Sequence, residues 1–172
     1  EYIPMESWLR GAIEFFDLPM SSFSLPNKQS TPLQIGDTPV AASVCYEIAY
    51  PELVRSEVNA GTSLMLTVSN DTWFEGSHGP AQHLQIARMR ALENHRWLIR
   101  ATNNGHTAVI DPLGRIAAQA PDRSTQVLQT EVWPNTESTV YQRFGSYPTL
   151  LGWLVLFVVA LIYSRRQRSF KH

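Results

Sequence analysis

Cys45 is the residue best suited to chemistry, and it is the only cysteine in the 172-residue chain. The run Pro39–Cys45 is small, apolar and β-branched, which predicts a buried strand that ends at the thiol. Tyr46 and Glu47 follow, and then a helix opened by Pro51. A turn between a strand and a helix lifts such a side chain out of the sheet and lets the next backbone N–H face an oxyanion. We therefore predict a thiol nucleophile for acyl transfer or C–N cleavage; the alternative is a small core cysteine.

A thiol must lose its proton before it attacks, so Cys45 needs a base or a cation nearby. The chain offers carboxylates at Glu1, Glu47 and Asp71. Neither of its lysines lies near a motif, because one falls in a turn-rich stretch and the other in the C-terminal tail. A single cysteine forms no internal disulfide, and a lone thiol in an oxidising compartment favours a reactive role.

A cluster of polar and aromatic residues follows the next expected strand. Asn70, Asp71, Trp73 and Phe74 either line a pocket for an acyl chain or headgroup, or form a loop cap with buried aromatics. Both interpretations fit the sequence equally well.

Arginines and histidines supply the remaining candidates. Arg88 and Arg90 either meet lipid phosphate or pair with carboxylates such as Glu93 on the same helix. His78 and His83 have no cysteine or paired carboxylate beside them, so we predict no metal site. We also predict no cofactor.

The predicted secondary structure around these residues alternates between strands and helices in the first part of the chain. A hairpin follows. This order predicts an α/β or α+β layered sheet. Further strands are expected over 63–69, 98–102 and 127–132, with a loop over 70–76 and a hairpin over 108–116. Helices are expected over 7–16, from Pro51 to Gly61 with Leu53, Val54 and Val58 inward, and from Pro80 to His95 with Leu84, Ala87 and Ala91 inward.

Residues 149–163 contain no charge and, with Tyr147 and Pro148, reach the short end of the length range for a membrane-spanning helix. Tyr147, Trp153 and Tyr163 place aromatics where interfacial belts occur. A buried core helix is the alternative, but a core helix rarely lacks a polar face and then ends in a basic tail.

Charge is divided along the chain. Residues 1–164 carry 10 bases and all 15 acids, a balance of −5, whereas residues 165–172 carry four bases and no acid, a balance of +4. This pattern excludes a uniformly basic nucleic-acid binder and predicts a cytoplasmic tail with residues 1–146 across the membrane. We predict a catalytic domain over 1–135, a linker over 136–146, a transmembrane helix over 147–164 and a basic tail over 165–172. Because the sequence starts with Glu rather than Met and has no signal peptide, we expect the C-terminal part of a longer protein.

Six sequence blocks in a fixed order, followed by the apolar stretch and the basic tail, closely resemble the nitrilase-superfamily domain of the bacterial apolipoprotein N-acyltransferases. The blocks are Glu1–Glu6, Phe16–Ser24, Val44–Glu47, Ser69–Phe74, Gln82–Glu93 and Arg100–Gly105.

The resemblance implies a four-layer αββα sandwich and a Glu–Lys–Cys triad whose nucleophile is Cys45. Tyr46 and Glu47 match positions beside the nucleophile that the family needs for activity, and Glu1 matches a second glutamate that supports the triad. The triad glutamate and lysine precede Glu1 in the family, as do N-terminal membrane helices. We therefore expect a sandwich that is incomplete at its N-terminus, and a chain that is inactive by itself.

The family reaction implies a phospholipid acyl donor, a thioester on Cys45, and an apolipoprotein acceptor with an N-terminal diacylglyceryl-cysteine. It also implies the bacterial inner membrane, with the catalytic domain facing the periplasm and without nucleic acid. Two alternatives remain: a membrane-tethered nitrilase-type amidase and a non-catalytic membrane-anchored scaffold.

Overall fold

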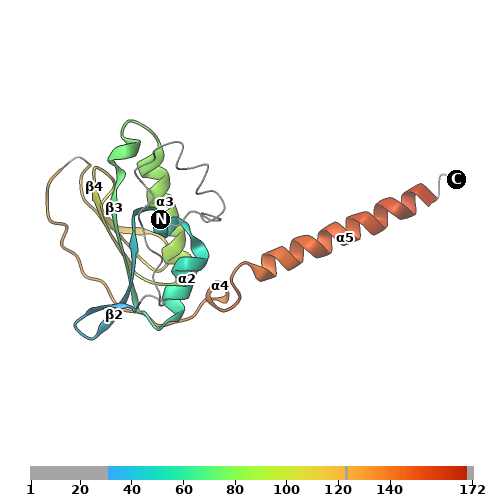
Figure 1. Ribbon diagram of the computed structural model, residues 1–172, viewed down its shortest axis with the longest axis horizontal. Coiled ribbons are helices and arrows are strands. Elements are labelled where there is room, and N and C mark those ends of the chain that lie inside the picture. The colour runs from blue at the N-terminus through green and yellow to red at the C-terminus, as the bar shows by residue number, and fades with distance from the viewer. Residues whose placement is uncertain (1–30, 123, 170–172) are drawn as a thin grey trace, which may run out of the picture. The chain divides into compact units, whose positions relative to one another are not determined.

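A computed structural model describes residues 31–122 and 124–169, with side chains as far as Ser164. Glu1 and the helix expected over 7–16 lie outside the described residues. The described chain forms one mixed sheet whose strands follow each other in sequence order, with α2 and α3 on one face (Figure 1). The strands are β1 (Leu33–Ile35), β2 (Thr38–Val44), β3 (Leu64–Asn70), β4 (Leu98–Asn103), β5 (Ala108–Ile110) and β6 (Ile116–Gln119).

The centre of the sheet is parallel. β2 pairs with β3 and β3 with β4 in parallel register, joined by the crossover helices α2 (Pro51–Asn59) and α3 (Gly79–Asn94). Right-handed crossovers that step in one direction along a sheet place both helices on the same face. The layered α/β class predicted from the sequence is therefore confirmed, and so are the helices at Pro51 and Pro80.

Antiparallel strands flank this centre. The predicted hairpin over 108–116 is confirmed as β5 and β6. On the other side β1 pairs with β2 through the two-residue turn Gly36-Asp37, where Gly36 has a φ of 59°. The sequence carried this signal, since a Gly-Asp pair between apolar runs is typical of tight hairpins.

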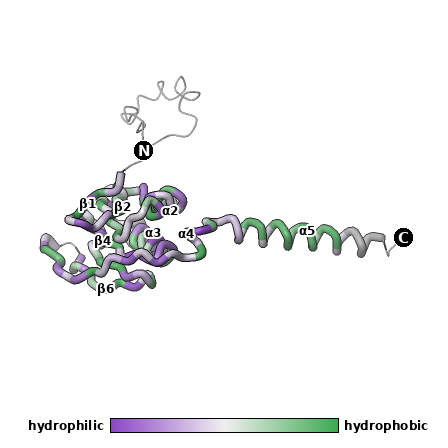
Figure 2. The backbone as a smooth tube through the Cα atoms, turned by 90° about the horizontal axis from the view of Figure 1, so that it is seen from below, coloured by the Kyte–Doolittle hydropathy of each residue, from purple (hydrophilic) through white to green (hydrophobic). Residues whose placement is uncertain are grey.

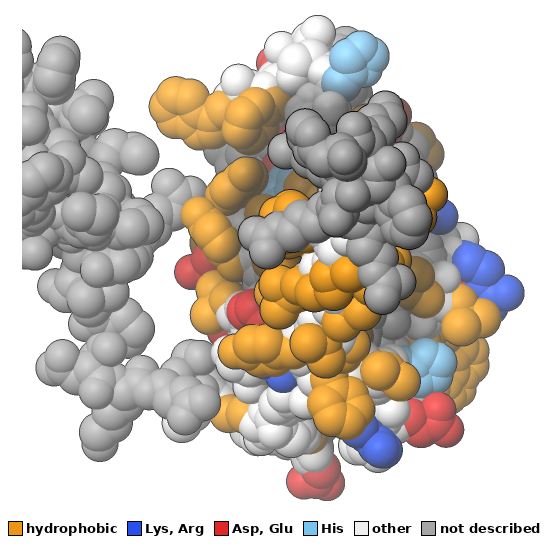
Figure 3. Space-filling view, turned by 90° about the vertical axis from the view of Figure 1, so that its right-hand side faces the viewer, with side chains coloured by type: hydrophobic (Ala, Val, Ile, Leu, Met, Phe, Trp, Pro, Cys, Tyr) orange, Lys and Arg blue, Asp and Glu red, His pale blue; other side chains and the backbone are white. Residues whose placement is uncertain are grey.

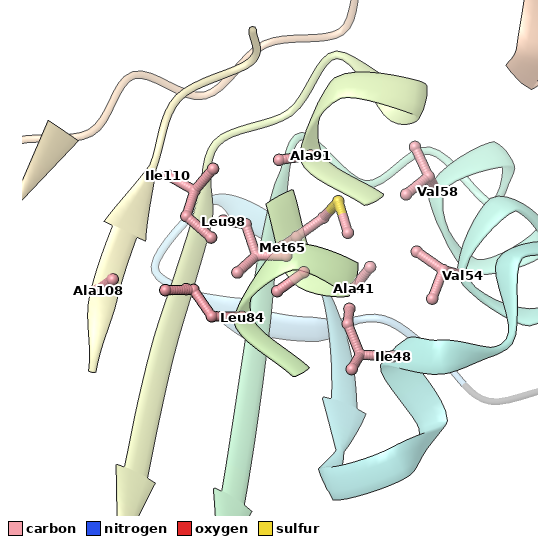
Figure 4. Packing of buried hydrophobic residues seen from close by; sticks show 11 residues of the cluster. Ala41, Ile48, Val54, Val58, Met65, Leu84, Ala91, Leu98, Ala108 and Ile110 are labelled. Atoms are coloured by element: carbon pink, nitrogen blue, oxygen red, sulfur yellow. The ribbon is translucent and has the colours of Figure 1, made fainter. Parts of the chain in front are cut away.

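The core lies between the sheet and the two helices (Figure 4). Ala41, Met65 and Leu98 project from the three parallel strands toward Val54 of α2 and Leu84 of α3. Each of these side chains is at most 5% exposed. The predicted inward residues Val58, Ala87 and Ala91 also belong to this cluster.

Two local predictions are wrong and one is refined. Leu53 is 41% exposed, because Val54 and Val58 already occupy the side of α2 that faces the sheet. Residues 127–132 form no strand; Val127 is 92% exposed and no described strand pairs with this segment. The loop over 70–76 contains a short 3₁₀ helix, η3 (Asp71–Phe74).

The segment predicted as a linker contains the short helix α4 (Val140–Phe144). Arg55 Nη1 and Asn59 Nδ2 of α2 donate to the Gln142 carbonyl at 3.0 and 3.2 Å. Thr139 Oγ1 donates to the Glu93 carbonyl of α3 at 2.5 Å. These bonds hold α4 against both crossover helices.

The last helix, α5 (Tyr147–Ser169), is hydrophobic over most of its length (Figure 2). Its span Tyr147–Ser164 is long and apolar enough to cross a membrane, and none of it is buried within the described structure. Hydrophobic side chains also gather on the face of the molecule shown in Figure 3. On α5, the side chains of Leu151 and Phe157 are both more than 60% exposed. Such exposure in water is unfavourable for a helix of this composition, which favours a lipid environment.

Candidate active site

The candidate site lies where the parallel strands end. Cys45 follows β2, Asp71 follows β3, and Asn103 is the last residue of β4. Parallel register brings these carboxyl ends to one edge of the sheet, with Asn70 opposite Asn103. Ligands and reactive groups in α/β proteins gather at this kind of edge.

Cys45 sits on a strained turn. Val44 is still extended, with φ −105° and ψ 119°, but Cys45 has a φ of 52° and begins the 3₁₀ helix η2 (Cys45–Ala49). A positive φ is uncommon for a residue with a side chain and costs about 1–3 kcal/mol, so it persists only where the surroundings enforce it. The turn predicted between strand and helix is present, and it leaves Cys45 partly exposed.

The two residues after Cys45 hold and border this turn. Glu47 folds back so that its Oε2 accepts a hydrogen bond from the Val44 backbone N–H at 2.7 Å. Tyr46 is 48% exposed, and its ring meets the ring of Tyr50 edge-on at 5.8 Å between centroids. Glu47 therefore supports the backbone of the turn, while the Tyr46 side chain is half-exposed beside it.

Behind Cys45 lies a buried polar cluster centred on Asp71, which has no exposed surface. Its Oδ2 accepts from Arg100 Nη2 at 2.7 Å. Its Oδ1 accepts from Ser69 Oγ at 2.6 Å and lies 3.0 Å from His83 Nδ1. Gly105 packs directly on this carboxylate, and a Cβ at that position would overlap it.

The electrostatics of the cluster favour charged groups. Burial opposes ionisation of Asp71, but hydrogen bonds from Ser69 and His83 and the charge of Arg100 outweigh it, so the pKa of Asp71 lies below its usual value. Burial lowers the pKa of Arg100, while the charges of Asp71 and Cys45 act in the opposite direction. The guanidinium is only 1% exposed and stays paired.

Ser69 connects the cluster to the thiol. Its Oγ lies 3.6 Å from Cys45 Sγ and donates to Asp71, which pairs with the buried Arg100. Among the carboxylates named from the sequence, Asp71 lies in this cluster, but its partner Arg100 was not predicted. An arginine at an inward position of a buried strand, two residues after Leu98, was the available signal, because such a charge requires a partner.

Three other candidates, Asn70, Trp73 and Phe74, are exposed to solvent. Asn70 Oδ1 accepts from the Thr72 backbone N–H at 3.2 Å, which caps η3. Trp73 is 88% and Phe74 45% exposed on the same short helix.

The two candidate arginines of α3 have different partners. Arg88 donates to the uncharged Gly114 carbonyl at 2.7 Å and to Gln85 Oε1 at 2.9 Å. Arg90 pairs with Glu93 at 3.0 Å, as one of the two sequence interpretations expected. The structure thus gathers Cys45 and Asp71 at one cluster, with Glu47 supporting the turn.

Solved structures share this fold. The carbon-nitrogen hydrolase from Helicobacter pylori G27 superposes with a TM-score of 0.52 at 19% identity, covering 59% of this chain and 43% of that one, a likeness that concerns the fold alone. The NitFhit protein of C. elegans superposes with a TM-score of 0.51 at 25% identity, covering 58% of this chain and 26% of that one.

Curated relatives are more similar in sequence. The apolipoprotein N-acyltransferase of Pseudomonas syringae pv. tomato is 52% identical over 170 residues, which cover 98% of this chain and 33% of that protein. The apolipoprotein N-acyltransferase of Shewanella oneidensis is 46% identical over 169 residues, covering 98% and 32%. The chain spans about a third of the length of the curated relatives it matches. Residues 7–141 match the carbon-nitrogen hydrolase family model, and the chain belongs to that family.

Proposed function

We propose that the protein is an N-acyltransferase that moves a fatty acyl chain from a phospholipid, through a thioester on Cys45, to the N-terminal amine of diacylglyceryl-cysteine apolipoproteins. The observation that carries the proposal is a thiol on a strained turn, in contact with the Ser69 hydroxyl of a buried charged cluster. Its occurrence in a chain 52% identical to a protein named apolipoprotein N-acyltransferase supports the specific reaction.

The proposed reaction has two balanced steps. The Cys45 thiolate attacks the ester carbonyl of the phospholipid; a C–S bond forms, the C–O bond breaks, and the lysophospholipid leaves with a proton. The acceptor amine then attacks the thioester; a C–N bond forms, the C–S bond breaks, and a base takes the proton of the amine. Dividing the transfer lets one site serve two bulky lipids in turn. No cofactor is required by this chemistry.

Roles for the neighbouring residues follow from their positions. Glu47 maintains the turn that presents the thiol, and the half-exposed Tyr46 contacts substrate. Trp73 and Phe74 offer exposed aromatic surface to the acyl chain or headgroup. The family resemblance assigns Glu1 to support of the triad.

The test of transfer against hydrolysis uses the protein expressed from its own gene, purified and placed in phospholipid vesicles. A synthetic diacylglyceryl-cysteine lipopeptide should gain an amide-linked acyl chain, while a matched lipopeptide with an acetylated α-amine should gain none. The reason is that only a free amine can attack the thioester. Mass spectrometry measures the acyl increment. Equal release of free fatty acid with both peptides would instead identify a hydrolase of the amidase kind.

We also propose that α5 anchors the protein in the bacterial inner membrane, with the catalytic region 1–135 in the periplasm and residues 165–172 in the cytoplasm. The balance of −5 over residues 1–164 against +4 over residues 165–172 supports this orientation. A phosphatase that is active only after export, fused after His172, should be silent, and a cytoplasm-dependent fluorescent protein there should fluoresce. The reverse pattern would contradict the orientation.

A further inference from the structure

We infer that His83 is a positioning residue for Cys45, holding the backbone of the nucleophile turn and the buried cluster in one arrangement. The inference rests on the proposal that Cys45 is the nucleophile. His83 lies in the second turn of α3, is 6% exposed, and points toward the carboxyl ends of β2 and β3 through its two ring nitrogens.

The two ring nitrogens of His83 contact two different parts of the site. Nε2 lies 3.2 Å from the backbone carbonyl oxygen of Cys45, which can only accept, so Nε2 carries a proton and donates. Nδ1 lies 3.0 Å from Asp71 Oδ1, a carboxylate held ionised by its other partners. One imidazole ring therefore bridges the nucleophile's backbone to the buried carboxylate.

This bridge accounts for the strained turn. A residue at φ 52° relaxes unless its carbonyl is held, and the Cys45 carbonyl is held by a ring that is itself fixed on Asp71. Asp71 in turn fixes Ser69, whose hydroxyl contacts Cys45 Sγ, and pairs with the buried Arg100. His83 thus fixes the backbone side of a cluster whose Ser69 hydroxyl contacts the sulfur.

Two amide substitutions test the two contacts of His83 separately. In His83→Gln the side-chain NH₂ lies at the distance of Nε2 and retains a donor for the Cys45 carbonyl. In His83→Asn the NH₂ lies at the distance of Nδ1 and retains a donor for Asp71 only. His83→Leu removes both contacts, and His78→Gln is the control, since His78 is exposed at the start of the same helix.

The experiment uses the protein expressed from its own gene in detergent or vesicles. The first readout is the rate of alkylation of Cys45 by iodoacetamide, followed at the Cys45 peptide by mass spectrometry. The second is N-acyl transfer to the lipopeptide, and thermal unfolding confirms that each variant is folded. His83→Leu and His83→Asn should lose about 10- to 100-fold in both rates, the cost of misplacing a reacting group by about 1 Å. Both rates should be about tenfold higher in His83→Gln than in His83→Asn, the factor for one buried hydrogen bond. The rates of His78→Gln should match those of the wild type.

If His83 had a purely structural role, the alkylation and transfer rates would fall only in proportion to the unfolded fraction. The His83→Gln and His83→Asn variants would then not differ. Folded Gln and Asn variants with equal alkylation rates would overturn the inference, as would wild-type rates in His83→Leu. Failure of the proposed function would give a different result. Cys45→Ala would then retain N-acyl transfer, while the alkylation rates of the His83 variants would still follow the expected order.

Discussion

Cys45→Ala, in the protein expressed from its own gene, should lose N-acyl transfer by a factor of about 10³ or more, since loss of a covalent nucleophile removes the route through the intermediate. Cys45→Ser should also be inactive, because a serine hydroxyl is far less acidic than a thiol and is a much weaker nucleophile near neutral pH. Turnover of phospholipid into lysophospholipid, with the lipopeptide as acceptor, measures the effect.

Ser56→Ala is a suitable control for these variants, because Ser56 is exposed on α2 and its hydroxyl bonds only within that helix. It should retain wild-type turnover. Substantial transfer by Cys45→Ala would show that the acyl group passes directly between the substrates.

Asp71→Asn should destabilise the folded protein by about 3–5 kcal/mol, because it leaves the buried Arg100 guanidinium without its counter-charge. Thermal or denaturant unfolding in detergent measures the difference. Asp122→Asn is the matched control: Asp122 pairs with His106 at 2.8 Å, but its side chain is 60% exposed. That variant should change stability by no more than about 1 kcal/mol, as surface pairs do.

The destabilisation by Asp71→Asn should depend on pH. The folded-state pKa of Asp71 is lowered, so its contribution is fully present above the unfolded value of about 3.9 and is lost as the pH falls through the folded value. The gap in stability between wild type and Asp71→Asn should therefore be constant near neutrality and shrink below about pH 4. A gap that widens in acid would contradict the ionised state of Asp71.

Much of the fold was predictable because local patterns coincide with burial. The run before Cys45 and the run 63–69 are short, apolar and bounded by turn residues, and both are parallel strands. Pro51 and Pro80 open their helices because proline's missing N–H has no partner in a first helical turn anyway. The strand predicted over 127–132 is absent, since a strand also needs hydrogen bonds to a neighbouring strand, and the described strands make none with this segment.

The candidate site was predictable only in part, for a physical reason. The strand end and the following helix located Cys45 and Glu47, since both signals are local. The cluster of Asp71, His83 and Arg100 joins three segments, and only the parallel register together with the placement of α3 over the sheet brings them together. Local sequence therefore indicated the proposed nucleophile and the carboxylate of Asp71, but not that His83 and Arg100 join them.

The central claim is that Cys45 carries the acyl group, and the intact mass of the resting protein in a phospholipid membrane tests it most directly. The protein should show a fatty acyl increment on the Cys45 peptide that neutral hydroxylamine removes, because hydroxylamine cleaves thioesters and leaves amides intact. Cys45→Ala should lack the increment. An unmodified Cys45 in an active enzyme supplied with phospholipid would contradict the account.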